Sequence, residues 1–349
     1  MFTASLVSLA LGASLLGIPH ASAPVAWFDT PQIPTITAEQ WIVYDADTDV
    51  ILAAWNVDEQ TPMASVTKVM TAIVVLENAD LATRITIPEL AAGTQGASAG
   101  LVEGERWTLG DLLIAMLVRS GNDTAVALAH YVGGGSVATF VDMMNARAVT
   151  FGMSSTRFAN PHGLDSDGHY STARDLLTLT AASQDYPEIR RITRIRLVTI
   201  PIDPSEKPKS FTNTNKLLGA YPGVTGLKTG NTNLAGKVLL LTSQRRGRNI
   251  YTVVMRSDDH FADTRELLDW AYSTYSIRDR WLRLLYGEGG DGPSLALDLD
   301  LPSSEERRLR ALPPLQDGRW STSSLEDLPK GASIGRWLRG AIPDVASGD

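Results

Sequence analysis

The sequence predicts an α/β (α+β) fold in which an antiparallel sheet is built from both ends of the chain and carries a helical insertion. Two observations support this prediction. Strand-like segments lie at the two ends of the main apolar region, and the segments between them repeat their apolar residues at helical spacing. A simple series of strand–helix–strand units would alternate the two element types instead.

The first strands are predicted at residues 41–56, where two apolar runs surround an Asp/Thr turn and indicate a β-hairpin. Asp45, Asp47 and Asp49 in this turn have the spacing that begins a calcium-binding loop. Such a loop also requires a glycine after these residues and a glutamate at its end, where this chain has Asn56. Turn formation is therefore the better interpretation of the three aspartates.

The remaining elements follow in two blocks. The predicted helices are 63–78, 108–134 with an interruption at Ser120-Gly121, 137–153, and 172–194 with a break near Pro187. Three successive strands are predicted at 223–230, 236–244 and 248–257, followed by a closing helix at 264–275. These strands and the first hairpin together make the expected sheet.

Both ends of the chain are predicted to lie outside the folded domain. Residues 1–23 have the pattern of a secretory signal peptide, with small residues before a cleavage site, so we expect an exported, extracytoplasmic protein. The other predicted parts are a linker at 24–40, one domain at 41–278 and a weakly ordered tail at 279–349. Any contact with a membrane is expected through the tail or through an uncleaved signal.

Composition and charge exclude several classes of function. The net charge is −8 and no basic block carries interleaved aromatic residues, so nucleic acid is not an expected partner. The absence of cysteine excludes disulfides, thiol nucleophiles and thiolate metal sites. His162 and His169 lie near Asp165 and Asp167 without the helical spacing of a metal site, and a loop packed by its own polar groups is the better interpretation. No metal or cofactor is expected.

The first predicted helix contains one lysine, Lys68, three residues after Ser65. Positions three apart share a helix face, so the two side chains can meet. Apolar surroundings disfavour the charged form of a lysine and lower its pKa, and a neutral amine beside a hydroxyl can make that serine a nucleophile. This is the only Ser-x-x-Lys among the seven lysines of the chain. The alternative for an isolated motif of this kind is an ordinary surface serine and lysine.

Two further motifs carry polar side chains. Ser120 and Asn122 flank the interruption between two predicted helices, where they are suited to relay a proton and to hydrogen-bond a substrate amide. Lys228, Thr229 and Gly230 lie on a predicted strand, an arrangement suited to an extended peptide that ends in a carboxylate. Taken singly, the first motif is also typical of a helix-joining turn, and the second of an edge strand protected by lysine.

In combination, Ser-x-x-Lys on a helix, Ser-x-Asn between helices and Lys-Thr-Gly on a strand resemble the motif set of penicillin-binding proteins and class A β-lactamases. From about residue 41 to 275 the chain is similar to D-alanyl-D-alanine carboxypeptidases of the low-molecular-mass penicillin-binding protein family. The segments "NPHGLD" at 160–165 and "YSTARDL" after it add to this resemblance. The resemblance implies a β-lactamase/transpeptidase-like fold, no cofactor, and peptidoglycan stem peptides (acyl-D-Ala-D-Ala) and β-lactams as partners.

The resemblance also implies a role for each motif residue. Ser65 would be the acylated nucleophile, Lys68 its base and Ser120 the relay of a proton to the leaving D-alanine. The residues implied in substrate binding are Asn122 in the second wall, Lys228, Thr229 and Gly230 at the substrate carboxylate, and Asn231, whose backbone N–H would form the oxyanion hole with that of Ser65.

One position departs from the family pattern. Family members often carry an arginine ten residues before the tryptophan of the closing helix, and counting back from Trp270 gives His260. We expect His260 to bind the terminal carboxylate weakly, or Arg256 or Arg265 to take this role. The departure bears on affinity more than on the type of reaction.

Three related functions and one unrelated nucleophile are alternatives. A peptidoglycan endopeptidase shares every motif, because the choice of bond depends on groove shape. A β-lactamase needs a glutamate in a Glu-x-x-x-Asn arrangement between Ser120 and Lys228, and none is present. A non-catalytic penicillin-binding protein usually lacks a motif residue. Ser98 in "GASAG" matches the nucleophile elbow of α/β-hydrolases, but the preceding strand and following helix are not predicted.

Overall fold

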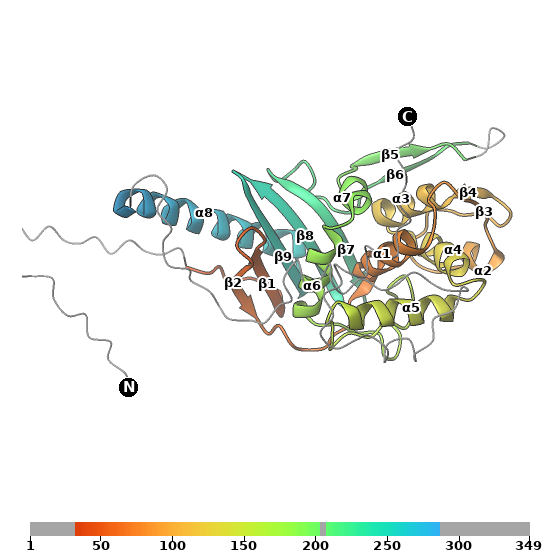
Figure 1. The fold of residues 1–349 in the computed structure, drawn as a ribbon, viewed down its shortest axis with the longest axis horizontal. Helices are drawn as coiled ribbons and strands as arrows, with labels where there is room; N and C mark the ends of the chain where they lie inside the picture. Colours follow the sequence, from red (N-terminus) through yellow and green to blue (C-terminus); the bar gives the residue numbers. More distant parts are fainter. Residues whose placement is uncertain (1–31, 203–206, 287–349) are drawn as a thin grey trace, which may run out of the picture. The chain divides into compact units, whose positions relative to one another are not determined.

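The computed structural model describes residues 32–202 and 207–286, with side chains up to residue 274 (Figure 1). Five strands form one antiparallel sheet in the order β2-β1-β9-β8-β7. Among the described residues the first strands are β1 (Gln40–Asp45) and β2 (Val50–Trp55), and the last are β7 (Val224–Thr232), β8 (Gly236–Arg245) and β9 (Arg248–Ser257). The prediction of a sheet assembled from both chain ends is confirmed, with β1 and β9 as the junction.

The sheet is buried on both faces. Along β1, Ile42 belongs to the same apolar cluster as the inserted helices, whereas its neighbours Trp41 and Val43 belong to a second cluster with Leu267 and Leu268 of α8. Successive side chains of a strand point to opposite faces, so this alternation fixes which face each residue covers. Helix α8 (His260–Tyr286) therefore covers one face, and the helical insertion covers the other.

The helical insertion lies between β2 and β7 in the chain (Figure 1). Its helices are η1 (Ala64–Thr67), α1 (Lys68–Asn78), α2 (Glu89–Ala92), α3 (Leu109–Arg119), α4 (Asn122–Val132), α5 (Val137–Thr150), α6 (Ala173–Ser183) and α7 (Pro187–Thr193). Two small hairpins complete it: β3 (Arg84–Thr86) with β4 (Arg106–Thr108), and β5 (Leu197–Ile200) with β6 (Lys209–Thr212).

Side-chain caps explain where three of these helices begin. The hydroxyls of Thr108, Ser136 and Thr172 accept hydrogen bonds from backbone N–H groups three residues later. Such bonds satisfy donors in the first turn that have no partner within the helix, and each cap typically stabilises a helix by about 1 kcal/mol. The starts of α3, α5 and α6 are therefore set locally by sequence.

Several predicted boundaries shift in the structure. The predicted helix at 63–78 begins as a short 3-10 turn and becomes α-helical at Lys68. The closing helix starts earlier than predicted and continues to Tyr286, past the position at which the tail was predicted to begin. The predicted signal peptide and most of the tail lie outside the described residues.

The aspartate-rich turn between β1 and β2 is held by its own polar groups. Asp45 Oδ1 accepts hydrogen bonds from the N–H groups of Asp47 (2.9 Å) and Thr48 (3.4 Å). Side chains that bond the backbone two or three residues later stabilise turns. The interpretation of these residues as a turn is confirmed.

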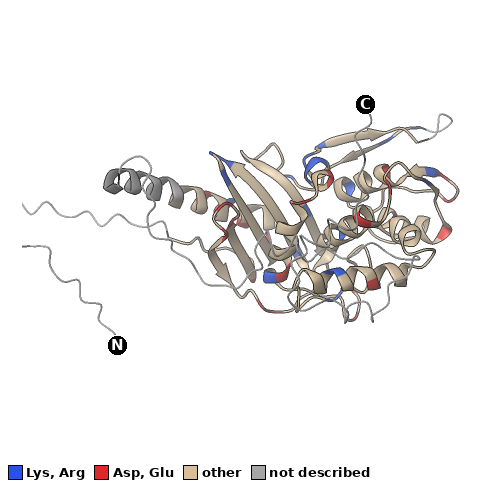
Figure 2. Cartoon of the chain, in the orientation of Figure 1, with Lys and Arg blue, Asp and Glu red and all other residues tan. Residues whose placement is uncertain are grey.

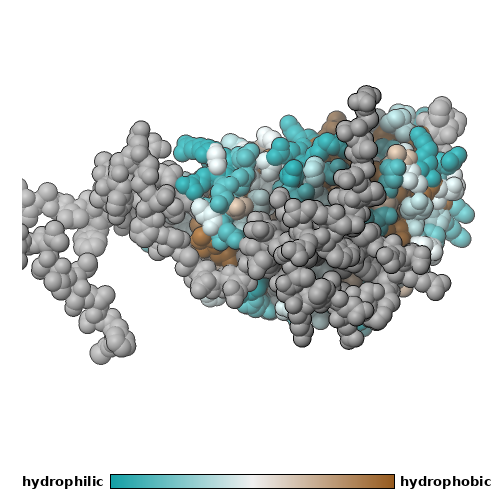
Figure 3. All heavy atoms as spheres, in the orientation of Figure 1, coloured by the Kyte–Doolittle hydropathy of each residue, from teal (hydrophilic) through white to brown (hydrophobic). Residues whose placement is uncertain are grey.

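The described part of the chain has charges of both signs on its surface. Lys and Arg are interspersed with Asp and Glu along its elements (Figure 2), and the coloured atoms that are visible in Figure 3 are mostly hydrophilic with small apolar areas. Among the described helices none is by itself long and apolar enough to cross a bilayer, and α4 and α5 pass that test only as a pair bent by 90°.

Candidate active site

The site centres on Lys68, the first residue of α1. Its side chain is fully buried, and Nζ lies 2.8 Å from Ser65 Oγ, 2.7 Å from Asn122 Oδ1 and 2.6 Å from the carbonyl oxygen of His162. The amide and carbonyl oxygens can only accept, so Nζ donates to both of them. In a neutral amine these two bonds use both N–H groups, and the lone pair remains for the Ser65 hydroxyl.

The surroundings of Lys68 favour this neutral form. Burial lowers its pKa well below the ordinary value, and the positive charge of Lys228 lowers it further. The carboxylate of Asp123 acts in the opposite direction. The structure therefore brings Lys68 next to Ser65 and disfavours its charged form, and the reactivity of this lysine stays a prediction.

Two glycines allow the backbone around Ser65 to pack closely. Ala64 has a φ of 51°, an uncommon value for a residue with a side chain. A Cβ on Gly163 would lie 1.9 Å from the Ala64 carbonyl oxygen, and a Cβ on Gly230 would lie 3.0 Å from Ser65 N. Any larger residue at Gly163 would displace the turn that presents Ser65.

Ser120 and Asn122 occupy the sharp turn between α3 and α4. Ser120 has left-handed backbone angles (φ 69°, ψ 30°) and ends α3, while Asn122 is the first residue of α4. This turn directs the Ser120 hydroxyl to Lys228 Nζ at 2.8 Å and the Asn122 amide to Lys68. One three-residue turn thus contacts both lysines.

Strand β7 forms a second side of the site and carries Lys228, Thr229 and Gly230. Lys228 is 1% exposed, and its Nζ donates to Ser120 Oγ and to the carbonyl oxygen of Thr229 (2.9 Å). Burial lowers the pKa of Lys228 to about 7. β7 is an edge of the five-stranded sheet, so its outer backbone groups are placed to pair with an extended peptide.

One residue on this side of the site was not predicted. Thr229 Oγ1 donates to Thr214 Oγ1 at 2.6 Å, and the Thr214 backbone N–H donates to the carbonyl oxygen of Val118 at 3.1 Å. Thr214 therefore joins the end of α3 to the middle of β7. A single threonine in a loop has no spacing signal, and only the folded chain brings it to the site.

His260, which stands where the family pattern has an arginine, is buried in the structure. It begins α8, is 8% exposed and stacks on Phe261 with ring centroids 4.0 Å apart. Burial lowers its pKa to about 4, so the imidazole is neutral at pH 7. Its role in binding stays a prediction, and a hydrogen bond is what it can offer near neutral pH. Arg256, one of its suggested replacements, pairs with Glu39 at 3.1 Å.

The histidines proposed to pack their own loop do so. His169 Nδ1 accepts from the N–H of Ala159 (3.0 Å), and its Nε2 lies 2.8 Å from Thr67 Oγ1, which in turn donates to the carbonyl oxygen of Ala64. This set of bonds fixes the imidazole with its proton on Nε2. No cluster of three or more potential metal ligands occurs among the described residues.

Ser98 does not lie on a nucleophile elbow. Neither a strand before it nor a helix after it is present in the loop at residues 93–105, and its hydroxyl donates to Asp123 at 2.5 Å. Such an elbow requires a strand-to-helix turn that exposes the serine. The prediction that this motif is not catalytic agrees with the structure.

Taken together, the site has the parts of a serine acyl-transfer site that uses a lysine in place of histidine. A hydroxyl faces a buried amine, a second serine is bonded to a second buried lysine, and an edge strand lies beside both. The chain belongs to the D-alanyl-D-alanine carboxypeptidase family of serine peptidases, whose family model matches residues 28–259. The family resemblance and the expected class of enzyme are thereby confirmed.

Individual relatives agree with this placement. The chain is 31% identical to D-alanyl-D-alanine carboxypeptidase DacF of Bacillus subtilis over 70% of its own length and 65% of DacF. It is 34% identical to DacB2 of Mycobacterium tuberculosis over 69% of its length and 84% of DacB2. A D-alanyl-D-alanine endopeptidase of Escherichia coli is 33% identical over 77% of this chain and 88% of the endopeptidase.

A solved structure confirms the fold. The crystal structure of the Streptomyces K15 DD-transpeptidase superimposes with a TM-score of 0.66 and 27% sequence identity, covering 69% of this chain and 99% of the transpeptidase. The predicted β-lactamase/transpeptidase-like fold is therefore confirmed, with the match confined to about two thirds of this chain.

A Lys68→Arg substitution tests the need for a neutral amine. Arginine keeps the positive charge but does not release its proton in a protein, so it cannot receive the Ser65 proton. We expect acylation by a fluorescent penicillin to slow by about 10²- to 10⁴-fold, the usual effect of losing a general base. Acylation at the wild-type rate, by a variant with a wild-type melting temperature, would contradict the role of Lys68 as base.

The pKa of Lys228 predicts a pH limit for substrate binding. Its charge is present below about pH 7 and is lost as the pH rises through that value, so binding of a carboxylate should weaken on the alkaline side. We expect kcat/KM to fall above about pH 7, mainly through KM, and Lys228→Arg to move this fall to higher pH. An alkaline limb at the same pH in both proteins would show that another group sets it.

Proposed function

We propose that the chain is a serine-type D-Ala-D-Ala carboxypeptidase, which removes the terminal D-alanine of peptidoglycan pentapeptides through an acyl-enzyme on Ser65. The observation that carries this proposal is the environment of Lys68 Nζ. Two of its bonds go to oxygens that can only accept, and the third contact is the Ser65 hydroxyl. A neutral amine in this position accepts the proton that Ser65 must lose.

Acylation begins with attack of Ser65 Oγ on the carbonyl carbon of the penultimate D-alanine, while Lys68 takes the hydroxyl proton. The carbonyl oxygen becomes negative and is stabilised by the backbone N–H groups of Ser65 and Asn231. The C–N bond then breaks, and the leaving amine receives, by way of Ser120, the proton that Lys68 took from Ser65, so that Lys68 is neutral again. The 2.8 Å contact between Ser120 Oγ and Lys228 Nζ supports this relay, because Lys228 donates to Oγ and leaves the Ser120 O–H free to donate to the leaving amine.

Deacylation uses water in place of the leaving amine. Water attacks the ester carbon and loses a proton to Lys68, which returns this proton to Ser65 Oγ as the ester bond breaks. Lys228 and Thr229 bind the terminal carboxylate before acylation, Gly230 lets β7 approach Ser65, and Asn122 binds a substrate amide. His260 adds a hydrogen bond at the carboxylate end.

The second candidate is a peptidoglycan endopeptidase, favoured by the similarity to the E. coli endopeptidase. The two activities share acylation chemistry and differ in what the groove accepts beyond the scissile bond. β-Lactamase activity ranks third, because the sequence between Ser120 and Lys228 contains no Glu-x-x-x-Asn arrangement that would supply a carboxylate for the deacylating water. A non-catalytic penicillin-binding protein ranks last, because no motif residue is missing: Ser65 contacts Lys68, and Ser120 contacts Lys228.

Localisation follows from the substrate. Peptidoglycan lies outside the cytoplasmic membrane, and residues 1–23 have the pattern of a secretory signal. We therefore place the protein at the extracytoplasmic face, with stem peptides and β-lactams as its small-molecule partners. Membrane contact through the tail or an uncleaved signal belongs to the same proposal.

The decisive experiment measures D-alanine release from a synthetic acyl-D-Ala-D-Ala peptide. Wild type should release one D-alanine per peptide and should be labelled by a fluorescent penicillin, whereas Ser65→Ala, which lacks the nucleophile, should do neither. Ser155→Ala is the matched control, since it removes another half-buried hydroxyl that the proposed chemistry does not use. Labelling without D-alanine release, together with cleavage of a cross-linked dimer, would establish the endopeptidase instead. Equal labelling of Ser65→Ala would overturn the proposal.

A further inference from the structure

The loop at residues 95–101, which contains the "GASAG" motif, lies against the turn that carries Asn122. The Asn122 backbone N–H donates to the carbonyl oxygen of Ala97 at 2.6 Å, and its side-chain Nδ2 donates to the carbonyl oxygen of Gln95 at 2.8 Å. Both partners are backbone acceptors of this one loop. The loop therefore contacts a residue of the proposed site, although it supplies no side chain to the chemistry.

The contact with Gln95 decides which way the Asn122 amide points. An amide presents a donor on one side and an acceptor on the other. With Nδ2 bonded to the Gln95 carbonyl, Oδ1 faces Lys68 Nζ at 2.7 Å. The opposite orientation would place the two donors, Nδ2 and Nζ, against each other and leave Oδ1 facing a carbonyl oxygen.

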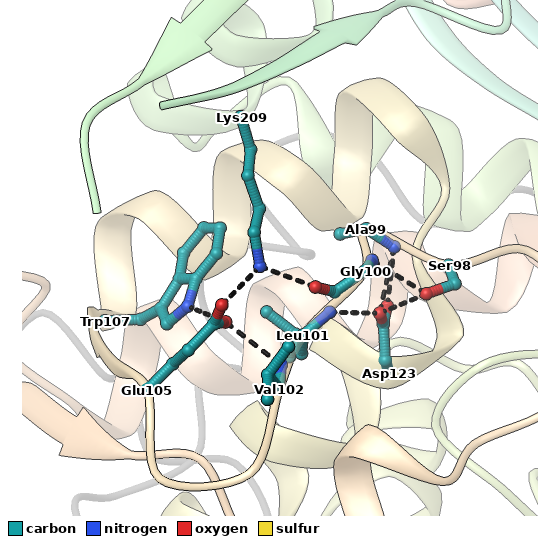
Figure 4. Close-up of polar contacts among 9 residues, drawn as sticks. All are labelled: Ser98, Ala99, Gly100, Leu101, Val102, Glu105, Trp107, Asp123 and Lys209. Carbon is teal, nitrogen blue, oxygen red and sulfur yellow. Dashed lines mark hydrogen bonds and ion pairs between the residues drawn. The ribbon is translucent and has the colours of Figure 1, made fainter. Parts of the chain in front are cut away.

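Asp123 holds the loop in this position (Figure 4). Its carboxylate is 1% exposed and accepts hydrogen bonds from the backbone N–H of Ala99 (2.9 Å) and of Leu101 (3.1 Å) and from Ser98 Oγ (2.5 Å). Buried ionised carboxylates are stable only when such donors surround them. Asp123 therefore fixes the loop, and the loop in turn fixes the side-chain amide of its neighbour Asn122.

The far side of the loop is anchored independently. Lys209 of β6 donates to the carbonyl oxygen of Gly100 (2.5 Å) and to Glu105 (2.6 Å), and Glu105 also accepts from Trp107 Nε1 (2.9 Å), as Figure 4 shows. The loop is therefore held between α4 and the β5–β6 hairpin. Hydrogen bonds to charged groups are stronger than neutral ones, so both anchors favour one loop conformation.

We propose that the 95–101 loop and Asp123 form a positioning unit that keeps Asn122 Oδ1 directed at Lys68 Nζ, with Asp123 as its central residue. This inference rests on the proposed function and assigns a role to residues outside the three motifs. Asp123 acts through Asn122 and is a positioning residue, since it touches neither the nucleophile nor the base in the described contacts.

The charge of Asp123 gives the unit a second effect on the base. The charged or titratable groups that face Lys68 are Lys228 and Asp123, together with His162 and His169, whose own pKa values burial lowers to about 3 and about 4. Both histidines are therefore neutral near pH 7. Asp123 is then the group that stabilises the protonated form of Lys68 against burial and against Lys228.

Two glycines of matched backbone geometry test the positioning role. Gly96 has a φ of 87°, and a Cβ there would lie 2.7 Å from Asn122 Nδ2. Gly104 has a φ of 84°, and a Cβ there would meet nothing within 4 Å. Alanine at either site adopts a similar positive φ, which L side chains rarely adopt, but only at Gly96 does the added Cβ also displace the Asn122 amide.

We expect Gly96→Ala to slow acylation by a fluorescent penicillin about ten-fold or more, and Gly104→Ala to stay within about two-fold of wild type. Melting temperatures of both variants report the shared strain. Equal rates for the two alanine variants, whether slow or normal, would overturn the positioning role. Failure of the proposed function is a separate outcome, seen as wild type that is not labelled or Ser65→Ala that is.

An Asp123→Asn substitution tests the charge. It removes the negative charge that favours protonated Lys68, so the pKa of Lys68 falls and the acid limb of the pH profile for acylation moves to lower pH. We also expect a lower plateau rate, because the loop loses part of its anchor. Asp111→Asn is the control: it removes the same charge and the capping contact with Thr108 in α3, and should leave the acid limb in place. An acid limb at the wild-type pH in Asp123→Asn would contradict the assignment.

Discussion

Burial of the Lys68 amine is the constraint on which the rest of the site depends. Burying an ammonium group away from water costs free energy unless acceptors or a counter-charge surround it. Loss of the proton removes most of this cost, so burial lowers the pKa of the lysine. Here two oxygens that can only accept, from Asn122 and from the His162 backbone, hold the amine in place, and no carboxylate of the described residues contacts it. The same arrangement leaves the lone pair toward Ser65, so the feature that makes the lysine costly to bury also makes it a base.

The fold meets this constraint by bringing three distant segments together. The 3-10 turn before α1 carries Ser65, the left-handed turn between α3 and α4 carries Ser120 and Asn122, and the edge strand β7 carries Lys228. The sheet delivers β7 because strands from both chain ends pair at β1 and β9. Close approach at Ser65 then depends on glycines that leave room for the backbone of the turn.

Part of this organisation could be predicted from the sequence. The spacing of Ser65 and Lys68 places them on one helix face, and the pattern around Lys228 predicts a strand. Side-chain motifs therefore predicted both the helix side and the strand side of the site. The His162 carbonyl and the loop carbonyls that hold Asn122 could not be predicted, because a backbone oxygen carries no residue signature. Thr214 and the buried, neutral state of His260 depend on tertiary packing, which neither composition nor spacing encodes. The strands β3 and β4 have only three residues each, too few for an alternating pattern to be visible, and β5 and β6 with four residues each are at the lower limit.

The most direct test of this account is the pKa of Lys68 itself. The chain has seven lysines, so ¹³C labelling of lysine gives a small set of Cε signals, and the Lys68→Arg variant assigns one of them. The account predicts that the Lys68 signal titrates well below the ordinary pKa of about 10.4 and that Asp123→Asn lowers its pKa further. Titration of Lys68 at the ordinary value, in folded wild-type protein, would contradict the claim that burial makes this lysine the base.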